Sequence, residues 1–319
     1  MSDKNSPDLW AAADLATPMA IRVAATLGLA DHIAAGRQTA EALATAVDAD
    51  PDALARVLRH LVTAGVLSGV GAYTLTALGE QLRELRPWFD LEGSVGRGDL
   101  CFVELLHTVR TGEPAFPRHF GRPFWEDLAA DPAREAQFDA LMGSRLTDSL
   151  TDVAAAYPWG ELGHVVDVGG GSGALLIAIL RAHPDLRGTV VDLPGPCARA
   201  EEAFAEAGLR DRAGTRPGTF FDALPPGAGG YVLSGILHDW DDRDATRILR
   251  RCAEAGGPVL VVDHLGEINT EGDLRMLCYF NGRERTLDDL TTVASAAGLQ
   301  RVRVVPAGSR SIIEFRRAG

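Results

Sequence analysis

The sequence predicts an α/β protein in which a doubly wound Rossmann-like domain follows a mainly helical N-terminal domain. From about residue 155 onward, short β-branched runs alternate with helical segments, which is typical of a parallel sheet covered by helices. One such run is joined to a helix through four glycines within five residues. The length of 319 residues suggests two domains, and the apolar fraction of 46% suffices for a sizeable core.

The glycine-rich stretch is the most informative part of the chain. Residues 165–168 form a β-branched run, and a helical pattern starts at Ala174 and ends before Pro184. A loop with few side chains at a helix N-terminus lets a nucleotide-like ligand approach the backbone. The alternative interpretation is a tight strand-to-helix turn without a ligand.

Two adenosine-containing ligands are compatible with this stretch. Gly169, Gly171 and Ala174 satisfy the dinucleotide pattern, and Asp192 follows at the separation expected for a ribose contact. A carboxylate there can accept both hydroxyls of any adenosine ribose. Nicotinamide adenine dinucleotide and S-adenosylmethionine therefore both remain open, and Asp192 as an ordinary strand-end residue is the alternative.

Residues 1–90 predict a winged-helix layout. A helical pattern over residues 20–34 breaks at Gly28, Thr39 caps the next helix, and a further helix over residues 51–64 leads into two short strands within residues 66–75. Such a domain can bind DNA or form dimers. The acidic approach to the third helix repels phosphates, so we expect a homodimer formed through this domain and no nucleic-acid partner.

The overall charge and the cysteines narrow the class of protein. The net charge of −13 and the pI near 5.1 argue against nucleic acid and anionic membranes as partners. The four cysteines are scattered without a C-x-x-C pair, which is typical of reduced thiols rather than a disulfide framework or a zinc site. No signal peptide or membrane span is visible, so we expect a cytoplasmic protein.

The rest of the chain divides into two predicted parts. Residues 91–155 are predicted to form connecting helices rich in aromatic side chains, which we expect to roof a ligand pocket at the domain junction. Residues 156–319 form the predicted nucleotide-binding domain. Its further elements are expected at 188–193, 196–207, 215–221, 230–237, 242–254, 258–263, 286–297, 300–306 and 311–316.

The predicted active site lies at the carboxyl ends of the parallel strands, where open α/β sheets bind ligands. His238 is placed at the end of the fourth strand, and imidazole titrates nearest neutral pH, so it is the natural general base. Asp263 and Glu284 can lie beside it and support the imidazolium. The alternative is that His238 merely caps the helix that starts at residues 241–242.

Five motifs occur in one order and together resemble a known family. They are Asp167-Val-Gly-Gly-Gly-Ser-Gly, Val191-Asp-Leu-Pro, Phe220-Phe-Asp-Ala-Leu-Pro, Leu237-His-Asp-Trp-Asp-Asp and Gly282-Arg-Glu-Arg-Thr. This pattern resembles the S-adenosylmethionine-dependent O-methyltransferases of the caffeic acid type, in the actinobacterial branch that modifies polyketides and other natural products. The resemblance covers nearly the whole chain.

The resemblance implies methylation of an aromatic hydroxyl of a secondary metabolite, with S-adenosylmethionine as cofactor and no metal. It implies catalytic roles for His238, Asp263 and Glu284. The implied cofactor contacts are Asp167, Gly169, Gly171, Asp192, Leu193, Thr219, Phe220, Ser234 and Trp240. The implied contacts to the acceptor, a small aromatic molecule, are Phe102, Trp125, Met142, Asp239, Met276, Phe280 and Asn281.

The sequence also departs from the family pattern. Thr219 stands where the family has an acid that holds the adenine edge, and Asp263 is shorter than the glutamate of the plant enzymes. Three alternatives stay open: a nicotinamide-dependent oxidoreductase, a methyltransferase-fold enzyme that hydroxylates or decarboxylates, and a winged-helix regulator with a ligand-sensing domain. An acid-flanked His238 favours plain methyl transfer.

Overall fold

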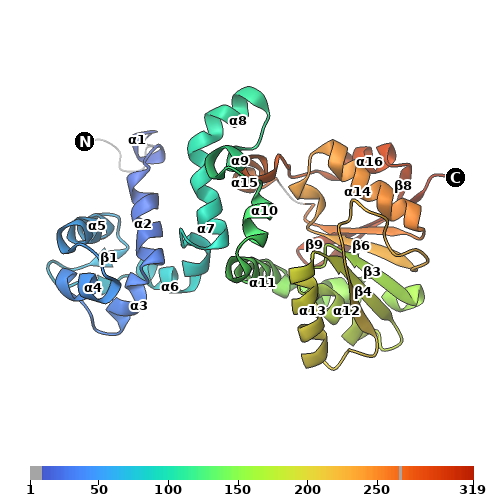
Figure 1. Ribbon diagram of the computed structural model, residues 1–319, viewed down its shortest axis with the longest axis horizontal. Helices are drawn as coiled ribbons and strands as arrows, with labels where there is room; N and C mark the ends of the chain where they lie inside the picture. The colour runs from blue at the N-terminus through green and yellow to red at the C-terminus, as the bar shows by residue number, and fades with distance from the viewer. Residues whose placement is uncertain (1–8, 266–267) are drawn as a thin grey trace. The chain divides into compact units, whose positions relative to one another are not determined.

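The computed structural model describes residues 9–265 and 268–319, with the side chains of 145–148 left aside. The chain separates into two compact units, residues 1–100 and 101–319 (Figure 1). None of the described helices combines the length and apolar character needed to cross a bilayer.

The N-terminal unit is helical with one small hairpin, as the sequence predicts. Gly28, at φ 62°, separates α2 from α3 where the sequence pattern breaks. The side chains of Thr39 and Asp50 cap α4 and α5. The elements are α1 (Leu9–Ala12), α2 (Ala16–Thr26), α3 (Leu29–Ala34), α4 (Ala40–Val47), α5 (Pro51–Thr63), β1 (Leu67–Ser68), β2 (Thr74–Leu75), α6 (Ala77–Phe89) and α7 (Ser94–Asp99).

The second unit alternates helices and strands after an all-helical start. Its first part holds the short helices η1 (Leu100–Glu104), α8 (Leu105–Thr111), α9 (Ala115–Phe120) and α10 (Phe124–Ala129), followed by the long α11 (Pro132–Ala156) and η2 (Trp159–Leu162). The remaining elements are β3 (His164–Val168), α12 (Ala174–Ala182), β4 (Arg187–Asp192), α13 (Pro194–Glu206), β5 (Ala213–Pro217), β6 (Gly230–Ser234), η3 (Leu237–Asp239), α14 (Asp242–Ala255), β7 (Val259–Asp263), α15 (Thr270–Phe280), α16 (Leu287–Ala296), β8 (Leu299–Ala307) and β9 (Arg310–Arg317).

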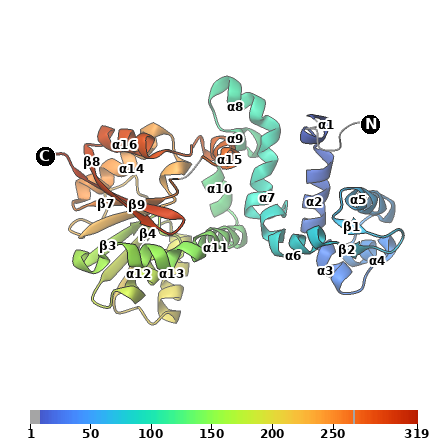
Figure 2. The same ribbon diagram turned by 180° about the vertical axis from the view of Figure 1, so that it is seen from behind.

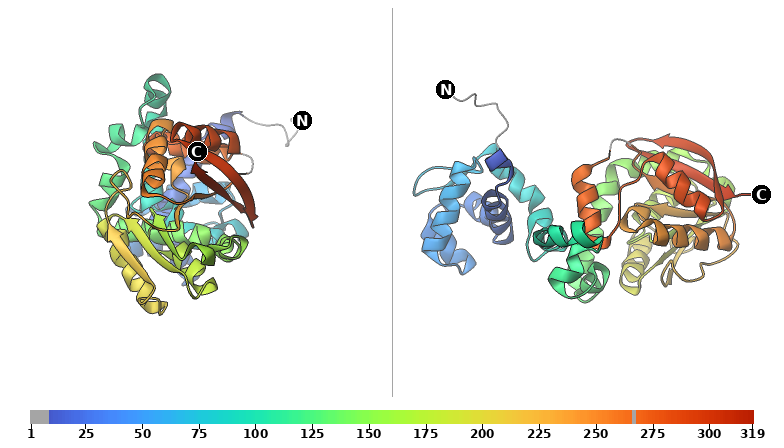
Figure 3. Two further views of the ribbon diagram at one scale, coloured as in Figure 1. Left: turned by 90° about the vertical axis from the view of Figure 1, so that its right-hand side faces the viewer. Right: turned by 90° about the horizontal axis from the view of Figure 1, so that it is seen from above.

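Seven strands form one sheet in the order β5-β4-β3-β6-β7-β9-β8. The pairs among β5, β4, β3, β6 and β7 are parallel, whereas β9 runs antiparallel to both β7 and β8. The β8–β9 hairpin, red in Figures 2 and 3, therefore closes one edge of the sheet. Strand order reverses between β3 and β6, and a ligand-binding crevice is expected at such a switch point.

Both faces of the sheet are covered, which makes the domain doubly wound. Helices α14 and α16 pack on one face, and α11, α12 and α13 pack on the other (Figure 1). The parallel strands read as near-continuous apolar runs because both of their faces are buried. The prediction of a doubly wound α/β domain is confirmed, but the third strand ends at Pro217 rather than at Phe221.

Candidate active site

The glycine loop between β3 and α12 is held by Asp192 at the end of β4. Gly169, Gly171 and Gly173 all adopt positive φ angles, which side chains disfavour. The Gly171 N–H donates to Asp192 Oδ2 at 2.8 Å, and the Leu193 N–H donates to Oδ1 at 2.7 Å. The carboxylate predicted to meet a ribose therefore also fixes the shape of the loop.

Two buried polar side chains lie at these strand ends without a partner among the described residues. Both carboxylate oxygens of Asp167 and the hydroxyl oxygen of Ser234 are without a hydrogen-bond partner among the described residues. Burial, with a contribution from the charge of Asp192, raises the pKa of Asp167 to about 7. A polar ligand with several donors, bound beside the glycine loop, would supply the hydrogen bonds that these atoms lack. These residues fit the amino-acid and ribose groups of S-adenosylmethionine.

Replacing Asp167 by Asn should stabilise the ligand-free protein increasingly as pH rises. A carboxyl with a raised pKa in the folded state contributes stability below its unfolded pKa of 3.8, and this is lost as pH rises toward 7. A neutral amide avoids this loss, which amounts to up to about 4 kcal/mol for a shift of about three pKa units. Urea unfolding at pH 4 and pH 8 measures the difference.

The matched control is Asp211→Asn, which changes an exposed acid at the opposite end of the strands. We expect this control to shift stability equally little at both pH values. An Asp167→Asn gain that does not depend on pH would contradict the protonation of Asp167 in the folded protein.

An apolar wall faces the glycine loop. A Cβ on Gly169 would lie 2.5 Å from Ile236 Cδ1 and 3.4 Å from Phe220, so a side chain there would have to displace Ile236. Trp240 meets Phe220 edge-on with ring centroids 5.6 Å apart. Thr219 is used locally, since its hydroxyl accepts the Phe221 N–H at 3.3 Å. Phe220 thus lies beside the glycine loop and Trp240 packs against Phe220, while Thr219 supports a turn.

His238 lies in η3, directly after β6, between two carboxylates. Its Nδ1 is 3.4 Å from Glu284 Oε1, and its Nε2 is 3.5 Å from Asp239 Oδ1. The imidazole side chain is 27% exposed, so it is reachable from solvent. A Cβ on Gly235 would lie 4.0 Å from Nε2, which places that nitrogen at the carboxyl end of the central strand.

The three nearby acids decide the charge of His238. Burial lowers its pKa, but Asp239, Glu284 and Asp263 outweigh that effect and raise the pKa to about 9. Burial in turn raises the pKa of Asp239 to about 6, although the charge of His238 opposes this. In the ligand-free protein at neutral pH, the imidazole is therefore largely protonated.

Two expectations about His238 can be compared with the structure. Asp263 makes no ion pair with His238 among the described residues, but its charge helps to raise the pKa of His238, and its Oδ1 accepts the His264 N–H at 2.8 Å. The acid in direct reach besides Glu284 is Asp239. The helix-capping alternative for His238 is wrong, since the side chain of Asp241 caps α14.

Aromatic side chains gather on the helices that precede the sheet and on α15. Trp125 stacks on Phe280 with centroids 5.1 Å apart and planes at 14°, and Phe124 packs edge-on against both rings. Phe102 joins the same apolar cluster. The Trp125 Nε1–H is buried without a partner among the described residues. This aromatic cluster offers flat surfaces and one unused donor.

The remaining predicted acceptor contacts lie on two helices. Met142 is on α11 and Met276 on α15, and both are partly buried. Asn281 has φ 63° and ends α15 as its left-handed cap, so its conformation already has a structural reason. Among the described residues, no group of three metal-binding side chains is present.

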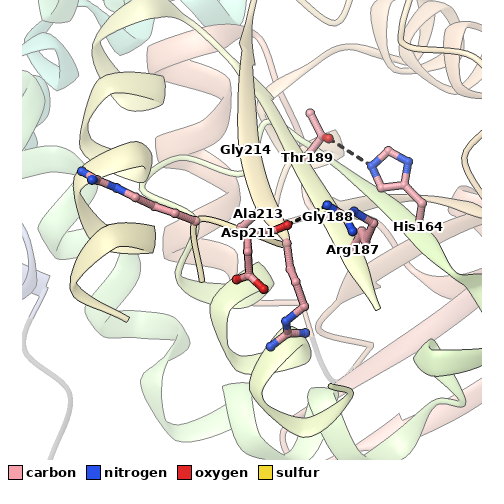
Figure 4. Close-up of a pocket in the computed structure, with 9 residues that line it drawn as sticks. His164, Arg187, Gly188, Thr189, Asp211, Ala213 and Gly214 are labelled. Atoms are coloured by element: carbon pink, nitrogen blue, oxygen red, sulfur yellow. Dashed lines mark hydrogen bonds between the residues drawn. The ribbon is translucent and has the colours of Figure 1, made fainter. Parts of the chain in front are cut away.

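A separate hollow of about 430 Å³ lies at the other end of the strands. It is lined by His164, Arg187, Gly188, Thr189, Arg210, Asp211, Arg212, Ala213 and Gly214. Figure 4 shows His164 turned to Thr189, with Nε2 and Oγ1 3.0 Å apart. These residues belong to the starts of β3, β4 and β5, so the hollow is not part of the predicted active site.

Sequence reasoning missed two features of this site. The sequence predicts that Asp239 contacts the acceptor, and the structure shows that it also pairs with His238. The sequence gives Arg285 no role beyond its place in a motif, and the structure shows it buried and hydrogen-bonded to the turn that carries His238. The signal available in the sequence was an arginine directly after Glu284 in the Gly282-Arg-Glu-Arg-Thr motif.

Comparisons with known proteins match both units. The O-methyltransferase domain family matches residues 102–300, and the O-methyltransferase dimerisation domain family matches residues 10–83. The chain is 54% identical to 2,7-dihydroxy-5-methyl-1-naphthoate 7-O-methyltransferase of Streptomyces carzinostaticus over 96% of each chain. It is 44% identical to aclacinomycin 10-hydroxylase of Streptomyces purpurascens, over 95% of this chain and 88% of that one.

A solved structure is similar throughout. It is an O-methyltransferase from neocarzinostatin biosynthesis in complex with S-adenosylmethionine and 2-hydroxy-5-methyl naphthoic acid. The TM-score is 0.95 at 53% identity, covering 98% of this chain and 100% of that chain. With both family models and the predicted strand-end motifs in agreement, this chain belongs to the O-methyltransferase family that carries an N-terminal dimerisation domain.

Proposed function

We propose that the protein transfers a methyl group from S-adenosylmethionine to an aromatic hydroxyl of a secondary metabolite, with His238 as the general base. The observation that carries this proposal is the placement of His238 directly after β6. Glu284 lies beside its Nδ1, and its Nε2 lies near the end of the sheet that holds the glycine loop. The cofactor choice is supported by the family and by the solved relative that holds S-adenosylmethionine.

The residues divide the work in a simple way. S-adenosylmethionine, when bound, supplies an electrophilic methyl group. Asp192 and the unpaired Asp167 and Ser234 would hold its polar groups, and Phe220 and Trp240 would line the apolar side of its site. His238 Nε2 removes the proton of the acceptor hydroxyl, while Glu284 keeps Nδ1 protonated and oriented. Positioning of the two reactants contributes more to the rate than proton removal.

The acceptor is proposed to be a hydroxynaphthoate-like aromatic molecule. The 54% identical relative is named for 7-O-methylation of 2,7-dihydroxy-5-methyl-1-naphthoate. In this chain the stacked Trp125 and Phe280 would contact a flat ring system, and the Trp125 N–H would donate to an oxygen on it. Phe102, Met142 and Met276 are proposed to complete the pocket, with Asp239 near the reacting hydroxyl.

Hydroxylation is a second candidate because a 44% identical relative is named as a hydroxylase. The two reactions change the product mass differently, by one methylene for methyl transfer and one oxygen for hydroxylation. The His238–Glu284 pair favours methyl transfer, since an oriented base has a direct task in activating a hydroxyl.

Calorimetric titration with S-adenosylhomocysteine tests the cofactor assignment, with nicotinamide adenine dinucleotide as the comparison. We expect saturable binding of the homocysteine compound and no heat from the dinucleotide. Binding of the dinucleotide alone would overturn the proposal. Asp192 would then be the ribose contact of a nicotinamide-dependent oxidoreductase.

The protein is proposed to be a cytoplasmic homodimer formed through its N-terminal unit. Its match to the dimerisation domain supports this, as do large exposed apolar side chains that include Leu15, 77% exposed, and Leu78, 49% exposed. The four free, buried cysteines fit a reducing compartment. The acidic composition supports the expectation that nucleic acid is not a partner.

Leu15→Glu should convert the dimer to a monomer, because a carboxylate inside an apolar interface stays desolvated without a partner. Sedimentation velocity at micromolar concentration measures the shift. Val302→Glu is the matched control, since this side chain is 50% exposed on β8 of the second unit, outside the dimerisation domain, and should leave the dimer intact. A Leu15→Glu protein that sediments like the wild type would place the interface elsewhere.

A further inference from the structure

The turn that carries His238 is held by a neighbouring segment of four residues. Among the residues described, the Arg283 N–H donates to the His238 carbonyl at 2.8 Å. Arg285 donates from Nη1 to the Leu237 carbonyl and from Nη2 to the Trp240 carbonyl at 2.8 Å. The carbonyls on both sides of the His238–Asp239 pair are therefore bound by one guanidinium group.

The Arg285 side chain is only 2% exposed, and its charge is met by Asp242. Nε and Nη2 lie 3.2 and 2.8 Å from the same carboxylate oxygen, Oδ1, at the start of α14. A planar guanidinium spreads its donors over three nitrogens in a fixed fork, which here reaches two carbonyls and a carboxylate, whereas an ammonium offers three donors on a single nitrogen. Replacing Arg285 by Lys therefore keeps the positive charge but loses the planar arrangement of donors.

Gly282 brings this segment against the turn without space for a side chain. A Cβ at residue 282 would lie 2.1 Å from the His238 carbonyl oxygen and 2.7 Å from the Asp239 carbonyl carbon. The close approach puts Glu284 opposite His238 Nδ1. Backbone and side chain of His238 are thus both fixed by residues 282–285.

We propose that Arg285 is a positioning residue for the reaction, which holds the Leu237–Trp240 turn so that His238 faces the acceptor hydroxyl. The proposal rests on the proposed function for its kinetic consequences. In this proposal Arg285 acts through His238 and touches neither reactant. Misplacing a reacting group by about 1 Å costs on the order of 100-fold in rate.

The first test is a kinetic cycle with Arg285→Lys, His238→Ala and the double variant, using 2,7-dihydroxy-5-methyl-1-naphthoate as acceptor. We expect Arg285→Lys to lower kcat by roughly 10- to 100-fold and S-adenosylhomocysteine affinity by less than about threefold. In the His238→Ala background the same change should cost less than about threefold, because the group being positioned is already gone. Additive losses in the double variant would overturn the proposal.

Arg212→Lys is the matched control for a merely structural arginine. Arg212 donates to the carbonyls of Leu180, His183 and Leu186, each at 3.1 Å, at the other end of the strands. The control should lose stability comparably while kcat per folded molecule stays at the wild-type value. Equal kcat losses in both lysine variants would show that Arg285 acts only through stability.

A second test needs no turnover and separates this proposal from the proposed function. The His238 resonance, assigned by its loss in His238→Ala, is titrated by NMR of protein labelled with ¹⁵N-histidine. Arg285→Lys should lower its titration midpoint by about one pH unit as the ring moves away from Glu284 and Asp239. An unchanged midpoint would contradict the proposal, whereas absent methyl transfer with a shifted midpoint would contradict only the proposed function.

If Arg285→Lys does not fold, Asp242→Asn is used in its place in both tests. It keeps the arginine and weakens the anchor that orients its fork. We expect about three- to tenfold lower kcat and a smaller shift of the His238 midpoint in the same direction. A wild-type kcat and midpoint in this variant would overturn the role of the anchored guanidinium.

Discussion

Replacing His238 by Ala should slow methyl transfer by two to four orders of magnitude while cofactor affinity stays near the wild-type value. The base is removed from the end of β6, but Asp192 and the glycine loop keep their contacts. General-base catalysis contributes about 10²- to 10⁴-fold, and a phenol with a pKa near 10 is a modest nucleophile while protonated. Steady-state kcat and calorimetry with S-adenosylhomocysteine measure the two effects separately.

The pH profile sharpens this test. Because nearby acids hold the pKa of His238 at about 9, kcat/KM should rise with pH below 9 and level above it. The His238→Ala variant should lose this rise of kcat/KM with pH. The His164→Ala variant, which lacks a partly buried imidazole at the other end of the sheet, should keep both the wild-type rate and the rise. Near-full activity of His238→Ala would refute the base assignment.

Replacing Asp192 by Ala should weaken S-adenosylhomocysteine binding by roughly 10- to 100-fold or more. This carboxylate accepts two backbone N–H groups that shape the loop, and it is also the proposed ribose contact. Hydrogen bonds to a charged group are worth about 1.5–3 kcal/mol each. Direct calorimetric titration gives the change in dissociation constant.

The control for this variant is Asp211→Ala, which removes an exposed acid at the opposite end of the strands. Affinity should stay within about twofold of the wild-type value there. An Asp192→Ala protein that binds the cofactor product normally would show that neither the loop shape nor the ribose depends on this carboxylate.

Local chemistry explains why much of the fold was predictable. The glycine loop, the Thr39 and Thr286 helix caps and the Gly28 break are set by residues a few positions apart. Apolar runs identified the buried parallel strands. The antiparallel direction of β9 was not predictable, because it depends on how the final hairpin pairs with β7 across the sheet.

The site was predictable in its residue types and less so in its pairings. The sequence predicts that Glu284 can lie beside His238, and the structure places its Oε1 3.4 Å from Nδ1. The contact of Asp239 with Nε2 depends on the turn geometry of η3, which no spacing rule encodes. The role of Arg285 likewise requires knowing that Gly282 lets residues 282–285 pack against that turn.

The most direct test of the account is to incubate the protein with methyl-labelled S-adenosylmethionine and 2,7-dihydroxy-5-methyl-1-naphthoate, and to analyse the product by mass spectrometry. The account predicts transfer of the labelled methyl group to one hydroxyl oxygen by the wild type, and a rate lower by two to four orders of magnitude in His238→Ala. A product that gains oxygen without the label, or equal labelling by both proteins, would contradict it.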